Sequence, residues 1–213
     1  MQTRYSDSGV FIALEGGEGA GKSTQAKLLE RWLVGRGHDV VLTREPGGTA
    51  VGAALRAILL DHDTGTLSPR TEALVYAADR AEHVDALIRP ALAAGSIVVT
   101  DRYVDSTLAY QGAGRSLEAT DLEQLAQIAT GGLRAHLTVV LDIDPVDGLA
   151  RAGEHDRMEA EPLDFHQRVR EQFLALAAAD PDGHVVVSAM DHPDAVHATI
   201  RAAVEPLLPS GDR

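Results

Sequence analysis

The sequence predicts an α/β protein with a doubly wound, five-stranded parallel sheet flanked by helices. Five short runs rich in valine and isoleucine are apolar almost throughout, as in strands buried on both faces of a parallel sheet. Stretches with helical patterning separate these runs, and this alternation is typical of doubly wound folds. The 213 residues contain no internal repeat and no low-complexity linker, so we predict one domain over residues 1–213.

The elements follow one another in a regular order. The predicted strands are residues 10–14, 40–43, 97–100, 137–143 and 185–188. The predicted helical stretches are about 22–36, 50–61, 69–94, 118–130, 163–179 and 193–207, with a further helix start at Asp144–Pro145. Two segments interrupt the pattern: a turn-dense stretch at 43–49, and a charged stretch at 151–162 that is either a solvated face or a mobile lid.

Composition narrows the classes of partner. The formal net charge is −13, which argues against DNA or another nucleic acid. Arginine accounts for 17 of the 19 basic residues, and arginine suits bidentate phosphate binding. There is no cysteine for a disulfide or a thiolate metal site. The first nine residues are polar and no apolar run is long enough to span a membrane, so we expect no membrane association and a cytoplasmic location.

A glycine-rich motif links the first predicted strand to the first predicted helix. Read from Gly16, it is G-x-x-x-x-G-K-S, the pattern of a P-loop. Its backbone N–H groups and the helix N-terminus bind phosphates, Lys22 reaches the β- and γ-phosphates of ATP, and Ser23 binds Mg²⁺. The nucleotide-binding residues are therefore Gly16, Gly17, Glu18, Gly19, Ala20, Gly21, Lys22, Ser23 and Thr24.

The third predicted strand ends in an acidic and a basic residue, Asp101 and Arg102. In a P-loop protein, an acidic residue at such a strand end is expected to bind Mg²⁺, directly or through water. Arg102 is then expected to face a phosphate in the same crevice. The alternative is a structural ion pair that holds the strand end.

Several further motifs give the chain a specific resemblance. They are T-R-E-P-G-G-T at 43–49, Y-A-A-D-R at 76–80 and D-R-Y-V-D-S-T-L-A-Y-Q-G at 101–112, followed by the arginine-bearing segment 151–157. Together with the P-loop, they resemble the thymidylate kinase family in the family's order, over about residues 10–190. The resemblance implies a P-loop kinase fold and Mg²⁺-dependent transfer of the γ-phosphate of ATP to dTMP, giving dTDP for dTTP synthesis.

The resemblance also implies roles around the acceptor phosphate. Glu18 matches an acidic residue that faces the 3′-hydroxyl of the acceptor and helps place its phosphate. Arg44 and Arg102 match arginines around that phosphate. The Glu45–Pro46 bond matches a position that is often cis.

Around the base, Tyr76 stands where the family usually has a phenylalanine that stacks on thymine, and packing between helices is the alternative for this tyrosine. Arg80 matches the arginine that reads the base, and the i, i+4 spacing puts both on one helix face. Further along, the resemblance implies base and deoxyribose contacts from Ser106, Thr107, Tyr110 and Gln111, with Tyr110 excluding a ribose 2′-hydroxyl; core packing is the alternative for Tyr110.

The P-loop lacks an arginine at the position that Gly19 occupies, where some family members carry one. Members without it supply arginine from the lid, here predicted at about 146–162. Arg151 and Arg157 are the two candidates, and the sequence does not choose between them. With Lys22, Arg102 and Glu18 they complete the predicted catalytic set.

Two other classes of P-loop protein are alternatives. A different nucleoside or nucleotide kinase would lack the paired acceptor-phosphate arginines or would read another base. A guanine-specific switch would carry an asparagine-containing base-recognition motif, and this chain has no asparagine. The family resemblance finally implies a homodimer. The alanine-rich stretch 71–94 is a candidate helix face for it, and burial in the chain's own core is the alternative for this stretch.

Overall fold

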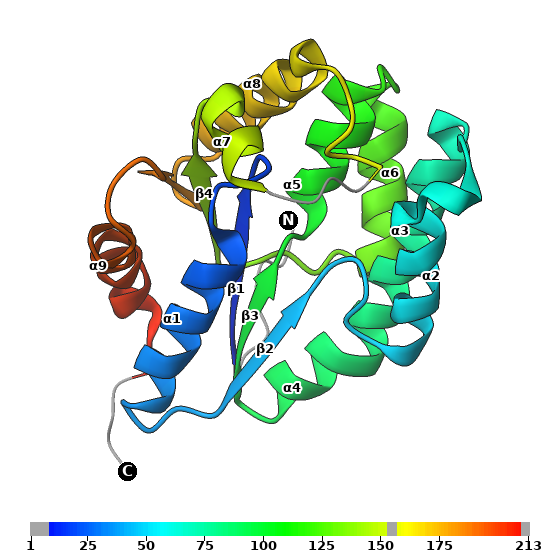
Figure 1. Cartoon of the computed structure of the whole chain (residues 1–213). Helices are drawn as coiled ribbons and strands as arrows, with labels where there is room; N and C mark the ends of the chain where they lie inside the picture. The colour runs from blue at the N-terminus through cyan, green and yellow to red at the C-terminus, as the bar shows by residue number, and fades with distance from the viewer. Residues whose placement is uncertain (1–8, 153–156, 210–213) are drawn as a thin grey trace.

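We describe the protein from a computed structural model, which places residues 9–152 and 157–209 (Figure 1). A five-stranded sheet of order β2-β3-β1-β4-β5 runs through its centre, and every neighbouring pair of strands is parallel. The strands are β1 (Val10–Gly16), β2 (Val40–Arg44), β3 (Ile97–Asp101), β4 (Leu137–Asp142) and β5 (His184–Ser188). The predicted α/β fold class and all five predicted strands are confirmed.

Helices cover both faces of the sheet (Figure 1). The α-helices are α1 (Lys22–Val34), α2 (Ala50–Leu60), α3 (Pro69–His83), α4 (Arg89–Ala93), α5 (Val104–Thr107), α6 (Ala119–Thr130), α7 (Pro145–Ala152), α8 (Leu163–Ala179) and α9 (Pro193–Val204). Short 3₁₀ turns η1 (His62–Thr64) and η4 (Glu205–Leu207) and the π-helical turns η2 (Val84–Ile88) and η3 (Leu108–Gly114) complete the elements. None of the helices in the described parts of the chain has both the length and the apolar composition needed to cross a bilayer.

The central strand shows why the apolar runs are continuous. Val10, Ile12 and Leu14 of β1 face the core formed with α1 and α9, whereas Phe11 and Ala13 face the opposite core with η2 and α4. Because successive side chains of a strand point to opposite faces, a strand covered on both sides needs apolar residues at every position.

The predicted helical stretch 69–94 is continuous but not uniform. It consists of α3, the wider π-helical turn η2 and α4. Pro90 lies at the start of α4. A proline has no N–H to donate and its ring crowds the preceding turn, and the widened turn ends directly before it.

One helical segment was not predicted. Residues 104–114 form α5 and η3, although Val104 and Thr107 are β-branched and Gly112 and Gly114 favour other conformations. A buried carboxylate compensates at the N-terminus: Glu15 accepts hydrogen bonds from the backbone N–H groups of Tyr103 (2.8 Å) and Ser106 (3.1 Å). This tertiary contact fixes the segment that carries several of the predicted substrate residues.

Candidate active site

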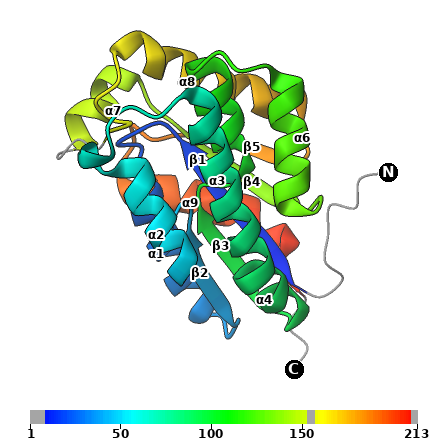
Figure 2. The same ribbon diagram turned by 90° about the vertical axis from the view of Figure 1, so that its right-hand side faces the viewer.

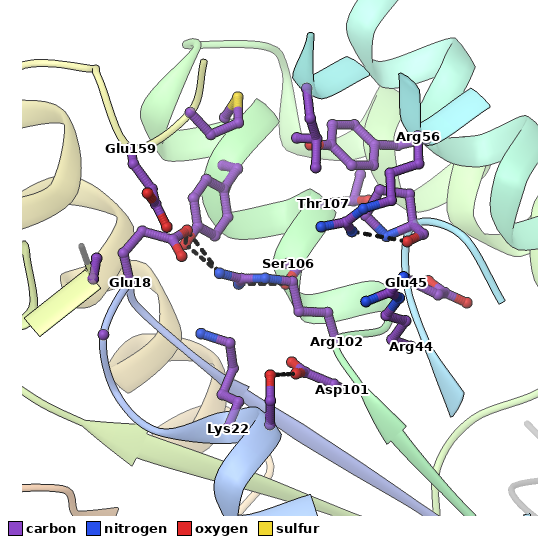
Figure 3. Close-up of a pocket in the computed structure, with 18 of the residues that line it drawn as sticks. Glu18, Lys22, Arg44, Glu45, Arg56, Asp101, Arg102, Ser106, Thr107 and Glu159 are labelled. Carbon is purple, nitrogen blue, oxygen red and sulfur yellow. Dashed lines mark hydrogen bonds and ion pairs between the residues drawn. The ribbon is translucent and has the colours of Figure 1, made fainter. Parts of the chain in front are cut away.

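A cavity of about 560 Å³ opens where β1, β2 and β3 end (Figure 3). Ligands bind at this edge in open α/β sheets because the loops after the strands converge there. Most of the predicted site residues line it: Glu18, Gly19, Gly21, Lys22, Ser23, Thr24, Arg44, Tyr76, Asp101, Arg102, Ser106, Thr107, Tyr110, Gln111 and Arg151. The residues that were not predicted for a site but line it are Glu45, Pro46, Arg56, Leu60, Ala152, Met158 and Glu159.

The P-loop wraps around the ammonium group of Lys22. Its Nζ donates to the carbonyl oxygens of Gly16 (3.1 Å) and Gly17 (2.6 Å), and Gly21 directly before it has a φ of 85°. Gly16 and Gly17 thus act through their backbone and do not line the cavity. Burial and the nearby guanidinium of Arg102 lower the pKa of Lys22, while Glu18 and Asp101 oppose this shift.

The absence of an arginine at position 19 has a structural reason. Gly19 has a φ of 65°, and a Cβ there would overlap the carbonyl oxygen of Gly148 in α7. In turn, a Cβ on Gly148 would overlap the carbonyl oxygen of Glu18. The helix that begins the predicted lid therefore packs backbone to backbone on the P-loop, and no side chain fits between them.

The predicted magnesium ligands meet at the end of β3. The hydroxyl of Ser23 donates a hydrogen bond to the carboxylate of Asp101 (Figure 3). These hard oxygen donors suit Mg²⁺, which usually takes its remaining ligands from phosphate and water. Among the described residues, no group of three or more histidine, cysteine or acidic side chains is arranged to hold a metal by itself.

Arg102 lies at the centre of the phosphate end of the cavity. Its backbone has a φ of 74°, which is rare for a residue with a side chain. Its guanidinium donates to Glu18 Oε1 (2.7 Å), the Tyr110 hydroxyl (3.0 Å), Ser106 Oγ (3.1 Å) and the Gly16 carbonyl (3.1 Å). The strained backbone is thus offset by four contacts that fix the guanidinium in the cavity (Figure 3).

Glu18 is held as an anion by its neighbours. Burial alone would raise its pKa, but Arg102, Lys22 and the Tyr110 hydroxyl outweigh that effect and lower it to about 2. The Tyr110 hydroxyl donates to Glu18 at 2.5 Å, and burial raises the pKa of this phenol. Glu18 therefore accepts hydrogen bonds and cannot donate them at neutral pH.

The other end of the cavity is less charged. Tyr76, Thr107 and Gln111 line it, but Arg80 does not. Arg80 is 2% exposed and donates to Glu45 Oε2, Thr107 Oγ1 and the Tyr103 carbonyl, each at 2.7 Å. The structure thus does not bring Arg80 to the cavity as predicted, because the buried carboxylate of Glu45 holds it behind Thr107.

The two elements that flank the turn after β2 each contribute an arginine to the cavity. Arg44 at the end of β2 lines the cavity beside Arg56 of α2, whose Nη1 donates to the Pro46 carbonyl at 3.0 Å (Figure 3). The Glu45–Pro46 peptide bond is cis, as the resemblance implied. Arg56 was missed because it lies in an apolar helix with no motif of its own.

The two candidate lid arginines lie in different places. Arg151 lines the cavity, and its Nη1 donates to the Ala189 carbonyl at 2.9 Å. Arg157 does not line it: its Nη2 pairs with Glu72 at 2.7 Å and its Nε donates to the Leu59 carbonyl at 2.8 Å. The buried carboxylate of Glu72 therefore turns Arg157 away from the P-loop. Residues 153–156 of the predicted lid lie outside the described residues.

Two buried acids were also missed. Glu15 ends the apolar run of β1, and a charge inside such a run is itself a signal of a specific partner. Burial, with a smaller contribution from Asp105, raises its pKa to about 7. Glu72 stands four residues before Tyr76, which itself stands four residues before Arg80. This i, i+4 spacing puts Glu72 on the same helix face as the two predicted residues, and it is the signal that could have identified it.

Comparisons with known proteins agree on one family. The family model described as thymidylate kinase matches residues 14–200. A thymidylate kinase of Synechococcus sp. (strain JA-2-3B'a(2-13)) is 55% identical over 200 residues, covering 94% of this chain and 96% of the relative. A thymidylate kinase of Clavibacter sepedonicus is 50% identical over 208 residues, covering 96% and 98%.

A solved structure gives the same result. The crystal structure of thymidylate kinase from Ehrlichia chaffeensis superposes with a TM-score of 0.79 at 30% identity, covering 92% of this chain and 99% of that one. The similarity thus extends over nearly the whole of both chains. The chain belongs to the thymidylate kinase family.

Proposed function

We propose that the chain transfers the γ-phosphoryl group of ATP to dTMP and forms dTDP. The observation that carries this proposal is the gathering of five cationic side chains around one cavity of a protein with a net charge of −13: Lys22, Arg44, Arg56, Arg102 and Arg151. Two nucleotides bring several phosphate charges together, and such a cavity offsets their repulsion. The family membership identifies the nucleotides.

The phosphate groups divide between two sets of donors. The P-loop amides and Lys22 hold the ATP phosphates, and Arg44 and Arg102 hold the phosphate of dTMP. The attacking phosphate oxygen is already ionised near neutral pH, so no general base is required. Catalysis comes from in-line positioning and from neutralisation of the charge that spreads over the γ-phosphate oxygens.

Ser23 and Asp101 are the residues that would hold Mg²⁺. The ion supplies charge neutralisation between the β- and γ-phosphates of ATP when it is bound. The hydrogen bond between Ser23 and Asp101 supports this assignment, since it brings two oxygen ligands together beside Lys22.

We assign the lid contribution to Arg151. Arg151 lines the cavity, whereas Arg157 is paired with Glu72 and does not line it. An arginine that faces the transferring phosphoryl group is worth about 10³–10⁵ in rate in related reactions.

The base and the sugar occupy the other end of the cavity. Tyr76 supplies a stacking surface, Gln111 a hydrogen bond to the base and Tyr110 a steric limit beside the sugar. Thr107 connects this end to Arg80, whose guanidinium then acts on the base through a side chain that the ligand touches.

A substrate panel tests the proposal directly. ADP formation is measured with dTMP, dUMP, dCMP and thymidine as acceptors, with and without EDTA. We expect dTMP to give the highest kcat/KM, and we expect EDTA to abolish turnover until Mg²⁺ is restored. Higher activity on thymidine would indicate a nucleoside kinase, and ATP hydrolysis without an acceptor would indicate a nucleotide-binding switch.

We also propose a homodimer formed by α2, α3 and α6, which lie on one side of the molecule (Figure 2). They expose the apolar side chains of Val51, Leu74 and Ile128, at 52%, 52% and 79%. Within the stretch 71–94, Val84, Ile88 and Leu92 are buried in the chain's own core, so only the early part offers a free face.

Light scattering tests the dimer. Leu74→Asp and Ile128→Asp are expected to give monomers. Val34→Asp on α1, where the valine is 54% exposed, is the control and should leave the mass unchanged. A monomeric wild type would contradict the proposal.

We further infer that residues 1–213 act as one kinase unit with a lid at about 146–162. We place this unit in the cytoplasm, where ATP and Mg²⁺ are plentiful.

A further inference from the structure

The carboxylate of Glu72 in α3 joins three segments behind the base end of the cavity. Oε1 accepts hydrogen bonds from Gln111 Nε2 (3.0 Å) and Arg115 Nε (3.2 Å). Oε2 accepts from Arg115 Nη2 (3.3 Å) and Arg157 Nη2 (2.7 Å). The Glu72 side chain is fully buried, and its hydrogen bond from Gln111 is buried as well, whereas the two arginines keep part of their side chains exposed.

Arg115 and Arg157 each have further partners besides Glu72. Arg115 pairs with Glu161 at 2.7 Å and lies over the ring of Phe165 at 5.0 Å. Arg157 also donates to the Leu59 carbonyl of α2. Both arginines that bind Glu72 are therefore held by other partners as well. This network makes the Glu72 carboxylate a rigid hydrogen-bond acceptor.

This acceptor determines which way the Gln111 amide points. An ionised carboxylate only accepts hydrogen bonds, so Gln111 must present its NH₂ group to Glu72. Although burial opposes ionisation, the hydrogen bonds from Arg115 and Gln111 lower the pKa of Glu72. The carbonyl oxygen is then the end of the amide directed away from Glu72. Gln111 lines the cavity, and an amide held in this way would meet a bound base with a hydrogen-bond acceptor.

The three pyrimidine bases differ in what they offer such an acceptor. Thymine and uracil carry a hydrogen on N3, which donates. Cytosine has no hydrogen on N3, and that nitrogen accepts instead. An acceptor facing an acceptor leaves two unpaired polar atoms in a closed site, which is strongly unfavourable.

We propose that Glu72 is a specificity-determining positioning residue, which orients the Gln111 amide so that the site selects pyrimidines with an N3–H. This inference rests on the proposed function, in which Gln111 contacts the base. Glu72 touches no substrate; it acts through Gln111. The same carboxylate anchors Arg157, so the part of the predicted lid that carries Arg157 and the base-reading residue depend on one buried charge.

Glu72→Gln tests the inference. A glutamine at this position both donates and accepts, so it no longer imposes one orientation on Gln111. We expect the ratio of kcat/KM for dTMP over dCMP to fall about tenfold or more. The ratio for dTMP over dUMP should stay within about twofold, because both bases carry an N3–H. A loosened pocket would change both ratios, and an unchanged dTMP/dCMP ratio would overturn the inference.

Glu161→Gln is the matched control. It removes the other carboxylate partner of Arg115 without touching Gln111, so both ratios should match the wild type. If Glu72→Gln does not fold, Glu72→Asp replaces it: the shorter carboxylate keeps its charge but withdraws from Gln111, and the same fall in the dTMP/dCMP ratio is expected.

A double-mutant cycle identifies the route of the effect. Gln111→Leu has no amide to orient, so adding Glu72→Gln to it should not change the dTMP/dCMP ratio further. An additional fall in the double variant would show that Glu72 acts by another route. A wild type that does not prefer dTMP to dCMP would refute the proposed function itself, whereas a wild type that does, with Glu72→Gln equal to it, refutes only the role of Glu72.

Discussion

The phosphate end and the base end of the cavity use charge in opposite ways. At the phosphate end, Arg102 and Glu18 are 16% and 14% exposed, and both line the cavity. At the base end, Glu72 is fully buried behind the wall, and only its uncharged partner Gln111 lines the cavity. Phosphate needs direct contact with cations, whereas a neutral base needs hydrogen bonds of fixed direction. At the phosphate end the charged groups therefore line the cavity themselves. At the base end the buried charge of Glu72 only holds the uncharged side chain that lines the cavity.

Arg102→Ala breaks the phosphate end and should have the largest effect. In the proposed function it removes a contact to the acceptor phosphate, and it leaves the Glu18 carboxylate without its ion-pair partner. We expect kcat/KM for dTMP to fall about 10³-fold, measured by steady-state kinetics. Arg36→Ala, which loses a surface pair with Glu205, is the control and should stay within twofold of wild type. A loss below tenfold in Arg102→Ala would place phosphate binding elsewhere.

Arg151→Ala and Arg157→Ala compare the two ends directly. Arg151 lies at the cavity, so its loss should lower kcat about 10²-fold with little change in KM for dTMP. Arg157 anchors Glu72, so its loss should destabilise the fold by about 3 kcal/mol, measured by denaturant unfolding, with a smaller loss of kcat. The reverse pattern would assign the transition-state role to Arg157.

Asp79→Asn tests a buried carboxylate whose charge is not fully balanced by its neighbours. We expect it to have the smallest effect of these substitutions, and the effect is on the free energy of unfolding. Burial, and then the nearby Glu45, raises the pKa of Asp79 to about 6. Because this lies above the ordinary value of 3.8, the charged form destabilises the fold above pH 6, and the effect disappears below about pH 4. Asparagine keeps an acceptor for the Gly47 N–H.

We therefore expect Asp79→Asn to gain about 2 kcal/mol of unfolding free energy at pH 8 and almost none at pH 4. Denaturant unfolding at several pH values measures this difference. Asp63→Asn, at an exposed position of η1, is the control, and at pH 8 its unfolding free energy should match that of the wild type. A loss of stability in Asp79→Asn at pH 8 would show that the Gly47 hydrogen bond outweighs the buried charge.

The residues proposed to bind phosphate were the ones that the sequence placed correctly at the cavity. Lys22, Ser23, Asp101 and Arg102 belong to local motifs at strand ends, and in a parallel sheet every strand end meets at one edge. The strands themselves followed from apolar runs, because a doubly covered sheet leaves no alternative pattern. Arg80 and Arg157 were predicted to lie at the site, but neither lines the cavity. Each is held instead by a buried carboxylate that is distant in the sequence.

The sequence alone determined the fold class, the edge of the sheet that carries the cavity and the family, because these depend on local spacing and on the order of motifs along the chain. The tertiary structure decided the rest. It placed Arg151 at the cavity and Arg157 at Glu72, packed Gly148 on Gly19, and used Glu15 to cap a helix of low intrinsic propensity. A buried charge takes its partners from whichever segments the fold brings within hydrogen-bond distance, and that distance is not encoded in spacing along the chain.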